Sequence, residues 1–358
     1  MKTKFTRRDV LKAGTALAAA TVYASPIRAQ VTSNAPPAET VTPALIEAAR
    51  KEGKVVHYTS VDLPLAEKVA KAFEAKYQGI AVRTERTGAE RVFTRIAQER
   101  SSNIHACDVV QSSDAAHFVV WKREGVLAPY VSEDVAKHYP PEHKDPDGLF
   151  ASYRVYLCVM ARNTDLVKTE DAPKSYRDLL DPKWAGKIVK AHPGYSGTIL
   201  TATYQTARDV GWDYYERLAK QRVMQVQSAS DPPKKLALGE RAIMADGIEY
   251  GVFQLKETGK PVDVIYPVEG SPLIIGPNGI LKSAPNPNAA RLLQNFMLSA
   301  ECQQFNVEFG GLRTAHALVK DKPGRVPMKD IRVMKDDAAA VERDSEEIKK
   351  RYTQHFKV

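Results

Sequence analysis

Strand-like and helix-like patterns alternate along the first third of this chain, and this alternation restricts its fold more than any single motif. Short β-rich runs, each followed by a stretch with helical periodicity, lie at residues 55–58, 80–82 and 107–110. The first helical stretch repeats Leu65, Val69 and Phe73 at the spacing of one helix face. Strand–helix–strand units of this kind build parallel sheets through right-handed crossovers that place helices on both faces. The sequence therefore predicts an α/β protein.

The second half repeats this pattern less regularly. Its β-rich runs lie at residues 153–160, 187–190, 242–245 and 264–266. Roughly 330 residues follow the first 29, which is enough for two domains of ordinary size. Proline and glycine gather at residues 267–278, and we expect the chain to cross between two lobes near residues 130–155 and 267–280. A charged surface helix is predicted for residues 338–357.

The N-terminus has the layout of an export signal. A basic segment with Arg7 and Arg8 precedes a short, alanine-rich apolar stretch, and Ala29 before Gln30 fits a cleavage point. The apolar stretch is too short to cross a membrane as a helix. The paired arginines resemble the twin-arginine signal, which a receptor reads. We therefore expect a signal peptide at residues 1–29, a loose leader at 30–42 and a periplasmic mature protein.

Composition excludes several classes of function. The net charge is +9, but six basic residues against one acid in residues 1–29 leave only about +4 for the rest, so no nucleic-acid partner is expected. The chain contains no P-loop, G-x-G-x-x-G, H-E-x-x-H or G-x-S-x-G motif, so no cofactor, resident metal or catalytic residue is predicted. Cys107, Cys158 and Cys302 have no C-x-x-C spacing; buried free thiols are expected, with one disulfide as the alternative.

Short polar residues concentrate in loops that follow the predicted strands. In open α/β sheets, ligands bind at the carboxyl ends of strands, where these loops lie. Each such residue alone is typical of an ordinary helix cap, but together they indicate one polar cleft. The run Ser196-Gly197-Thr198 has the chemistry of an anion site, because a helix N-terminus offers free N–H groups and Gly197 lets a ligand approach them. The candidate ligand-binding residues are Ser60, Asp62, Ser112, Ser113, Ser196, Gly197, Thr198, Glu249 and Tyr250.

Three segments resemble bacterial ABC-transporter solute-binding proteins of the ferric-iron-binding type. They are the opening strand at residues 53–60, the strand and helix from Asp108 to the Gly-Val-Leu-Ala-Pro ending at 125–129, and Asp-Leu-Leu-Asp-Pro-Lys-Trp-Ala-Gly-Lys-Ile at 178–188. The resemblance covers about residues 45–320. It implies two α/β lobes, each a mainly parallel sheet flanked by helices, that close around one ligand in the interlobe cleft. Lobe 1 is expected from residues 43–140 and 270–315, and lobe 2 from 141–269 and 316–358.

The resemblance also implies that the protein binds and delivers a ligand and catalyses no reaction. Such a protein is a monomer that delivers its ligand to an ABC permease in the inner membrane and is not an enzyme. Ferric-binding relatives use a His, a Glu and a Tyr-Tyr pair, and the matching positions here are Asp62, Ser113, Glu249 and Tyr250, so a conventional iron site is not expected.

The residues at the anion-binding position match the family more closely than those at the iron-ligand positions do. Ser196-Gly197-Thr198 matches the helix start where relatives hold phosphate or carbonate. We therefore expect a small organic anion, phosphorylated or carboxylated, as the ligand. Ferric iron is the first alternative, and a periplasmic hydrolase that uses Asp62 and Glu249 is the alternative of another class.

Overall fold

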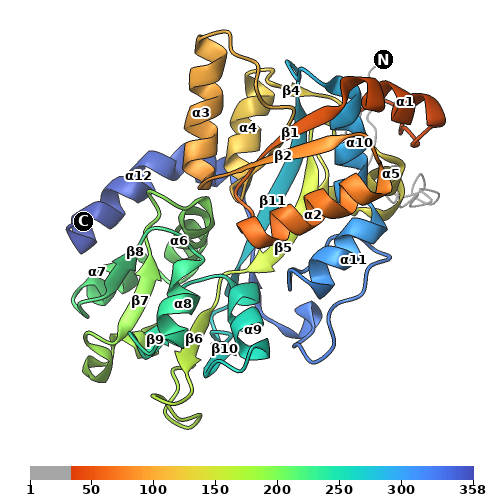
Figure 1. The fold of residues 1–358 in the computed structure, drawn as a ribbon. Helices are drawn as coiled ribbons and strands as arrows, with labels where there is room; N and C mark the ends of the chain where they lie inside the picture. Colours follow the sequence, from red (N-terminus) through yellow and green to blue (C-terminus); the bar gives the residue numbers. More distant parts are fainter. Residues whose placement is uncertain (1–33) are drawn as a thin grey trace, which may run out of the picture. The chain divides into compact units, whose positions relative to one another are not determined.

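The structure is a computed structural model that describes residues 34–358, which form one compact unit. Within these residues the chain builds two β-sheets, each flanked by helices (Figure 1). The α/β fold with two lobes, predicted above, is confirmed. The predicted signal peptide at 1–29 and the start of the leader lie outside the described residues. No helix in residues 34–358 has both the length and the apolarity that crossing a bilayer requires.

The first sheet has seven strands within the described residues, in the order β12-β11-β3-β1-β2, with β4 and β5 also paired to β11. Strand β1 runs parallel to β2 and β3, whereas β11 runs antiparallel to β3, β4 and β5. The strands are β1 (Lys54–Thr59), β2 (Ala81–Arg86), β3 (Val109–Gln111), β4 (Leu127–Ala128), β5 (Ala151–Leu157), β11 (Ser271–Leu281) and β12 (Val333–Met334).

The second sheet has five strands in the described part of the chain, in the order β10-β6-β9-β7-β8. Strand β7 is parallel to β8 and β9, and β6 is antiparallel to β9 and β10. Each sheet therefore contains as many antiparallel as parallel strand pairings, and the chain crosses between the sheets from β5 to β6 and from β10 to β11. The strands are β6 (Met160–Asn163), β7 (Ile188–Ala191), β8 (Met224–Val226), β9 (Ile243–Met244) and β10 (Val262–Ile265).

Helices cover both faces of each sheet (Figure 1). Around the first sheet lie α1 (Pro43–Glu52), α2 (Leu63–Lys76), α3 (Ala89–Ser101), α4 (Ala115–Arg123), α5 (Glu133–His138), α10 (Pro287–Leu298) and α11 (Ala300–Glu308). Around the second lie α6 (Gly197–Asp209), α7 (Trp212–Ala219), α8 (Asp231–Ala237) and α9 (Glu249–Glu257). Short 3₁₀ helices occupy Pro141–His143, Arg177–Leu180, Pro182–Trp184 and Met328–Asp330.

Helix α2 forms where the apolar spacing predicted it. Leu65, Val69 and Phe73 are all buried, so the predicted face is the one that packs on the sheet. The three cysteines are buried and free, which confirms the expectation of unpaired thiols.

The C-terminal helix α12 (Ala338–Phe356) contacts both halves of the described unit. It packs on α4 beside the first sheet and on α6 and α7 beside the second. Val341 and Ile348 of α12 meet Ala116 of α4 and Leu200 of α6 in one apolar cluster. The charged surface helix predicted for residues 338–357 forms, and it packs on elements of both lobes rather than on lobe 2 alone.

The first crossing between the sheets lies later than expected. Strand β5 pairs with β11 from Leu157 opposite Leu273 to Ala151 opposite Asn278, so it belongs to the first sheet rather than to the expected lobe at 141–269. The chain enters the second sheet only at Met160. Every residue of β5 is buried, and a strand buried on both faces has no alternating pattern that reveals its partner. The return crossing, between β10 and β11, falls at the start of the expected interval.

Candidate functional site

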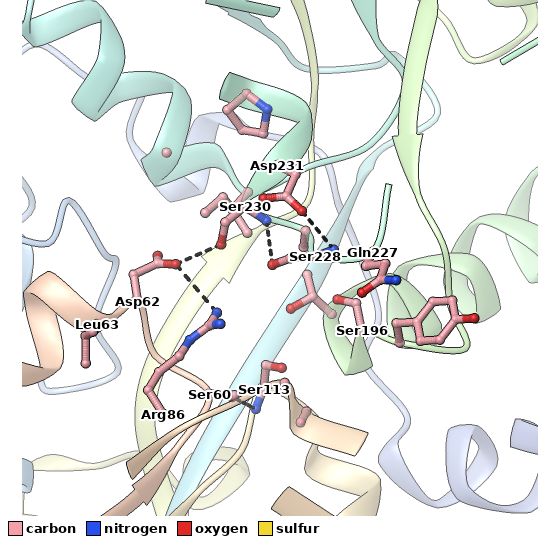
Figure 2. Close-up of a pocket in the computed structure, with 18 of the residues that line it drawn as sticks. Ser60, Asp62, Leu63, Arg86, Ser113, Ser196, Gln227, Ser228, Ser230 and Asp231 are labelled. Carbon is pink, nitrogen blue, oxygen red and sulfur yellow. Dashed lines mark hydrogen bonds and ion pairs between the residues drawn. The ribbon is translucent and has the colours of Figure 1, made fainter. Parts of the chain in front are cut away.

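One cavity of about 980 Å³ lies between the two sheets. Its walls come from loops that follow strands in both halves: Ser60 and Asp62 follow β1, Ser113 follows β3, and Ser196 follows β7. Figure 2 shows these side chains converging with the loop Gln227–Asp231 that follows β8. The cavity therefore occupies the place where open α/β sheets bind ligands.

Most of the residues predicted from sequence line this cavity. They come from both sheets, although they are scattered along the chain. The lining members of the predicted set are Ser60, Asp62, Ser113, Ser196, Thr198 and Tyr250. The other three, Ser112, Gly197 and Glu249, do not line it.

Glu249 is fully buried and engaged elsewhere. Its carboxylate accepts hydrogen bonds from Arg313 Nη2 at 2.8 Å, Arg313 Nε at 3.0 Å and the Tyr266 hydroxyl at 2.6 Å. These bonds tie the start of α9 to the segment that follows α11. A carboxylate whose lone pairs are used in this way is not free to bind a ligand.

Gly197 and Ser112 have structural partners instead of a ligand. A Cβ on Gly197 would lie 2.5 Å from Asp114 Cβ and 3.2 Å from Ala89 Cβ. The missing side chain of Gly197 therefore allows α6 to pack closely against the starts of α3 and α4. The expected role, close approach of a ligand to the backbone, is not the one that the structure shows for this glycine. The Ser112 hydroxyl lies 3.0 Å from His117 Nδ1 and accepts from the Asp114 N–H at 3.1 Å.

Arg154, in the centre of β5, is the main lining residue that sequence reasoning missed. Its side chain is 2 % exposed, and its Nη2 donates to Ser60 Oγ at 3.0 Å. Its Nε has no hydrogen-bond partner, and no carboxylate in residues 34–358 lies within ion-pairing distance of the guanidinium. Burial alone would lower the pKa of Arg154, but neighbouring groups that include the Asp62 carboxylate raise it, so the group stays charged. The sequence feature that could have indicated Arg154 is its position as the single arginine within the apolar, β-rich run at residues 153–160.

Hydroxyl and backbone donors surround Arg154. Ser60 Oγ accepts from the Ser113 N–H at 2.8 Å, which holds the loops after β1 and β3 together. Ser196 is the N-cap of α6, and the Thr198 hydroxyl lies 2.7 Å from the Tyr156 hydroxyl. The first N–H groups of a helix have no intrahelical acceptor and carry partial positive charge. This end of the cavity is therefore rich in donors and positive in potential.

A second set of polar contacts in the cavity is built around Asp62. Its Oδ1 accepts a hydrogen bond from the Ser230 hydroxyl at 2.8 Å (Figure 2). Its Oδ2 accepts a hydrogen bond from the Tyr250 hydroxyl at 2.9 Å. Arg86 Nη2 lies 3.9 Å from the same carboxylate. Burial and the charge of Asp62 raise the pKa of Tyr250 well above its usual value, so the phenol stays protonated. Asp62 thus links the first lobe to two residues of the second.

Metal-binding groups fall into two places among the described residues. In the cavity, the Asp62 carboxylate and Tyr250 hydroxyl offer oxygen donors, but Ser113 supplies no carboxylate and Glu249 is bound to Arg313. The set that ferric relatives would need is therefore not assembled here. A cluster of two acids and a histidine, one of which (Glu90) also lines the cavity, is described below.

A cavity at the strand ends, between two α/β lobes, has the position of a small-molecule binding site. Residues 107–330 match the family described as bacterial extracellular solute-binding protein. Because the match spans more than half of the chain, the chain belongs to this family. Its members bind a small ligand outside the cytoplasm and interact with a membrane permease; they are transport proteins rather than enzymes.

Relatives and solved structures agree with this assignment. An uncharacterized protein of Haemophilus influenzae is 27% identical over 268 residues, covering 72% of this chain and 76% of its own. A Salmonella typhimurium protein, whose name proposes 2-aminoethylphosphonate as its ligand, is 25% identical over 241 residues, 64% of this chain and 67% of its own.

Two solved structures show the same fold. Periplasmic binding protein AfuA from Actinobacillus pleuropneumoniae, with fructose-6-phosphate bound, has a TM-score of 0.79 and 26% identity over 86% of this chain and 99% of its own. Iron-bound HitA from Pseudomonas aeruginosa has a TM-score of 0.73 and 22% identity over 84% of this chain and 99% of its own.

Proposed function

We propose that this protein is the periplasmic solute-binding component of an ABC importer and that its ligand is a small organic anion, phosphorylated or carboxylated. The observation that carries the proposal is Arg154, a guanidinium buried in the wall of a 980 Å³ cavity with no carboxylate partner among residues 34–358. A buried charge is costly unless it is paired and hydrogen-bonded. An anionic group of the ligand would supply the missing partner.

The surroundings of Arg154 suit an oxyanion. Ser60, Ser113 and Thr198 line the cavity with hydroxyl groups, and Ser196 caps the α6 N-terminus, a ready anion site. The cavity volume also falls within the range of about 300–1,000 Å³ that is typical of small-molecule sites, and it far exceeds the space of a bare ion.

The carboxylates in the cavity wall would select the rest of the ligand. Asp62 and Asp231 line the cavity, and carboxylates of this kind favour a hydroxyl or ammonium group. The fructose-6-phosphate bound to AfuA and the 2-aminoethylphosphonate in the name of the Salmonella protein both combine a phosphorus oxyanion with such a group. These relatives support an amphoteric or polyhydroxy anion for the present chain.

Ligand binding would favour the closed arrangement of the lobes. A ligand that contacts both lobes shifts the equilibrium by its differential affinity for the closed state. Closure then proceeds about the crossing segments β5–β6 and β10–β11, as in other hinge motions. The closed monomer would present the surface that the permease recognises.

A thermal-shift panel tests the proposal. The panel contains fructose 6-phosphate, 2-aminoethylphosphonate, inorganic phosphate, citrate and Fe³⁺. A ligand at 100 times its Kd adds about 2.7 kcal/mol to the free energy of unfolding and raises Tm. We expect at least one organic anion to raise Tm in the wild type and not in Arg154→Met. Stabilisation by Fe³⁺ alone, with the visible absorption of an iron–phenolate complex, would overturn the organic-anion proposal.

Ferric iron is the second candidate, and one contact favours it. The Asp62 carboxylate and the Tyr250 hydroxyl, 2.9 Å apart, are a pair of oxygen donors at the cavity wall, and the fold is that of iron-bound HitA. The engagement of Glu249 by Arg313 opposes it. The same engagement removes support for a hydrolase, since the pair Asp62 and Glu249 does not face one cavity.

A further inference from the structure

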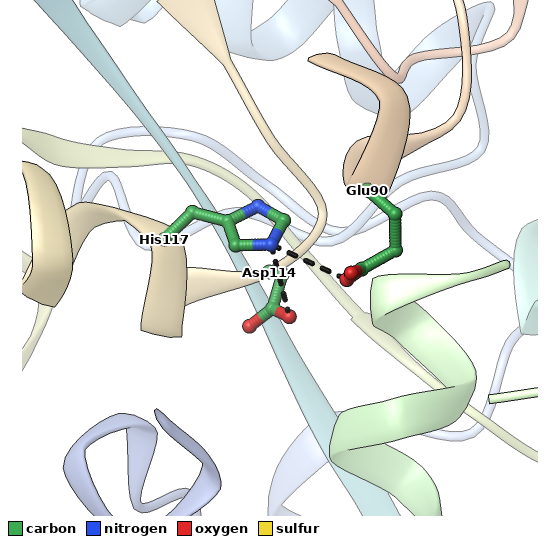
Figure 3. A group of neighbouring side chains, drawn as sticks. All are labelled: Glu90, Asp114 and His117. Carbon is green, nitrogen blue, oxygen red and sulfur yellow. Dashed lines mark ion pairs between the residues drawn. The ribbon is translucent and has the colours of Figure 1, made fainter. Parts of the chain in front are cut away.

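Glu90, Asp114 and His117 form a compact cluster in the first lobe (Figure 3). Glu90 lies in the first turn of α3, Asp114 is the N-cap of α4, and His117 lies in the first turn of α4. One oxygen from each acid and one imidazole nitrogen all lie within 4.8 Å of one another. Asp114 is 1 % exposed and His117 is 6 % exposed. None of the three was a candidate in the sequence analysis.

We propose that these three side chains bind a divalent transition-metal ion of the zinc type. Zinc takes nitrogen and carboxylate ligands at about 2.0–2.2 Å, so two ligand atoms of a tetrahedral site lie roughly 3.3–3.6 Å apart. His117 Nε2 lies 3.3 Å from Glu90 Oε1 and 3.7 Å from Asp114 Oδ2. The two distances from His117 Nε2 therefore lie close to those of a first coordination shell, and the two carboxylate oxygens lie within 4.8 Å of each other.

Hydrogen bonding leaves the inner atoms of the cluster unsatisfied. Glu90 Oε1 and Asp114 Oδ2 are both buried, and apart from their ion-pair contacts with His117 Nε2 they have no partner among the described residues. A single proton on His117 Nε2 can point at only one of them. Buried polar atoms in folded proteins are normally partnered, and an unpartnered carboxylate oxygen is costly. A cation between the three groups satisfies both oxygens at once, which one imidazole proton cannot do.

The other polar atom of each side chain, which points away from the centre of the cluster, has a hydrogen-bond or ion-pair partner. His117 Nδ1 lies 3.0 Å from Ser112 Oγ, and donation from Nδ1 to this hydroxyl leaves Nε2 with its lone pair for a metal. Asp114 Oδ1 accepts from the Ala116 N–H at 2.9 Å, and Glu90 Oε2 accepts from Lys349 Nζ at 3.1 Å. Such outer partners orient metal ligands and tune their affinity. Ser112, a predicted ligand contact, is therefore assigned to this site as a positioning residue.

The cluster lies where the lobes meet. Asp114 Cβ is the atom that a side chain at Gly197 of α6 would strike, and Lys349 belongs to α12, which packs on both lobes. The two carboxylates and the Lys349 ammonium beside Glu90 sum to a net charge of −1, which attracts a cation. An ion here would brace the first-lobe surface against which α6 packs. This inference does not depend on the identity of the organic ligand.

Metal binding is tested with the untagged full chain after treatment with a chelator. Titration with Zn²⁺ by calorimetry should show one tight site, and Co²⁺ should give the visible absorption of a four-coordinate complex with nitrogen and oxygen ligands. His117→Gln and Asp114→Asn should each weaken Zn²⁺ binding at least tenfold. Asparagine is as good an N-cap as aspartate, so Asp114→Asn keeps α4 intact.

The matched control is His105→Gln, which removes an exposed histidine outside the cluster and should leave the affinity unchanged. Ser112→Ala should weaken binding about tenfold while the Co²⁺ absorption keeps its shape, as expected of a positioning residue. Circular dichroism of each variant confirms the fold. Absence of the Co²⁺ spectrum in the wild type, or equal Zn²⁺ affinity in wild type, His117→Gln and Asp114→Asn, overturns the proposal.

Discussion

The Tyr250 hydroxyl of the second lobe donates a hydrogen bond of 2.9 Å to the Asp62 carboxylate of the first. The other oxygen of Asp62 accepts from Ser230 at 2.8 Å, so one carboxylate holds both residues of the opposite wall. Hydrogen bonds to a charged group contribute about 1.5–3 kcal/mol each, and the partial exposure of Asp62 places these two at the low end of that range. This contact stabilises the arrangement in which the two lobes enclose the cavity.

Replacing Asp62 by alanine should therefore weaken ligand binding. The variant loses both bonds across the cavity, and the closed state becomes less populated, so we expect the Kd of the best ligand in the panel to rise at least tenfold. Isothermal titration calorimetry measures the Kd, and small-angle scattering with and without ligand reports closure. Asp165→Ala, at an exposed position, serves as the control. Unchanged affinity and closure in Asp62→Ala would show that the bridge has no role.

Arg154→Met should separate binding from stability. Removal of a buried charge that lacks a carboxylate partner is expected to leave the free energy of unfolding of the ligand-free protein within about 1 kcal/mol of wild type, or higher. Ligand affinity should fall about 100-fold or more, because the anion loses its charged partner. Urea unfolding and calorimetry measure the two quantities. A large loss of stability with normal affinity contradicts the proposed role.

Arg313→Met, in contrast to Arg154→Met, should lower the stability of the ligand-free protein. Arg313 is as deeply buried as Arg154, but it pairs with Glu249, and its removal leaves that carboxylate buried without a counter-charge. Breaking such a pair costs about 3–5 kcal/mol. We expect a clear drop in the urea midpoint of the ligand-free protein. The double variant Arg313→Met with Glu249→Gln should recover part of this loss, since it removes both charges. If the single variant is as stable as wild type, the pair has no structural role.

His57 should make stability fall in acid. It is buried in β1, and burial lowers its pKa from 6.5 to about 4. Above pH 6.5 the imidazole is neutral in both the folded and the unfolded chain, so it adds no pH dependence. Between 6.5 and 4 the unfolded chain binds a proton that the folded chain excludes, so stability is lost as the pH falls.

The expected loss from His57 is about 2 kcal/mol at about pH 5 relative to about pH 7.5. Urea unfolding at the two pH values measures it. His57→Leu should reduce the pH dependence by this amount, whatever its effect at neutral pH. Equal pH dependence in the two proteins would mean that His57 is protonated in the folded state or titrates normally.

The alternation of patterns was sufficient to predict the α/β class and the location of the site. Strand-end loops lie together in any open α/β sheet, so Ser60, Asp62, Ser113 and Ser196 could be assigned to one cleft without coordinates. Burial of Leu65, Val69 and Phe73 follows directly from the helical period. The position of β5 was not predictable, because a fully buried strand carries no alternation and its partner β11 is more than a hundred residues away.

The sequence by itself determined the alternation of strands and helices, the polar loops at the strand ends and the family resemblance, because each depends on residues close together in the chain. Only the tertiary structure decided which charges are paired. It joins Arg313 to Glu249 across 64 residues, leaves Arg154 facing the cavity without a carboxylate, and gathers Glu90, Asp114 and His117 from separate segments. The reason is physical: electrostatic pairing and burial depend on distances through space between distant segments, and sequence periodicity contains no such distances.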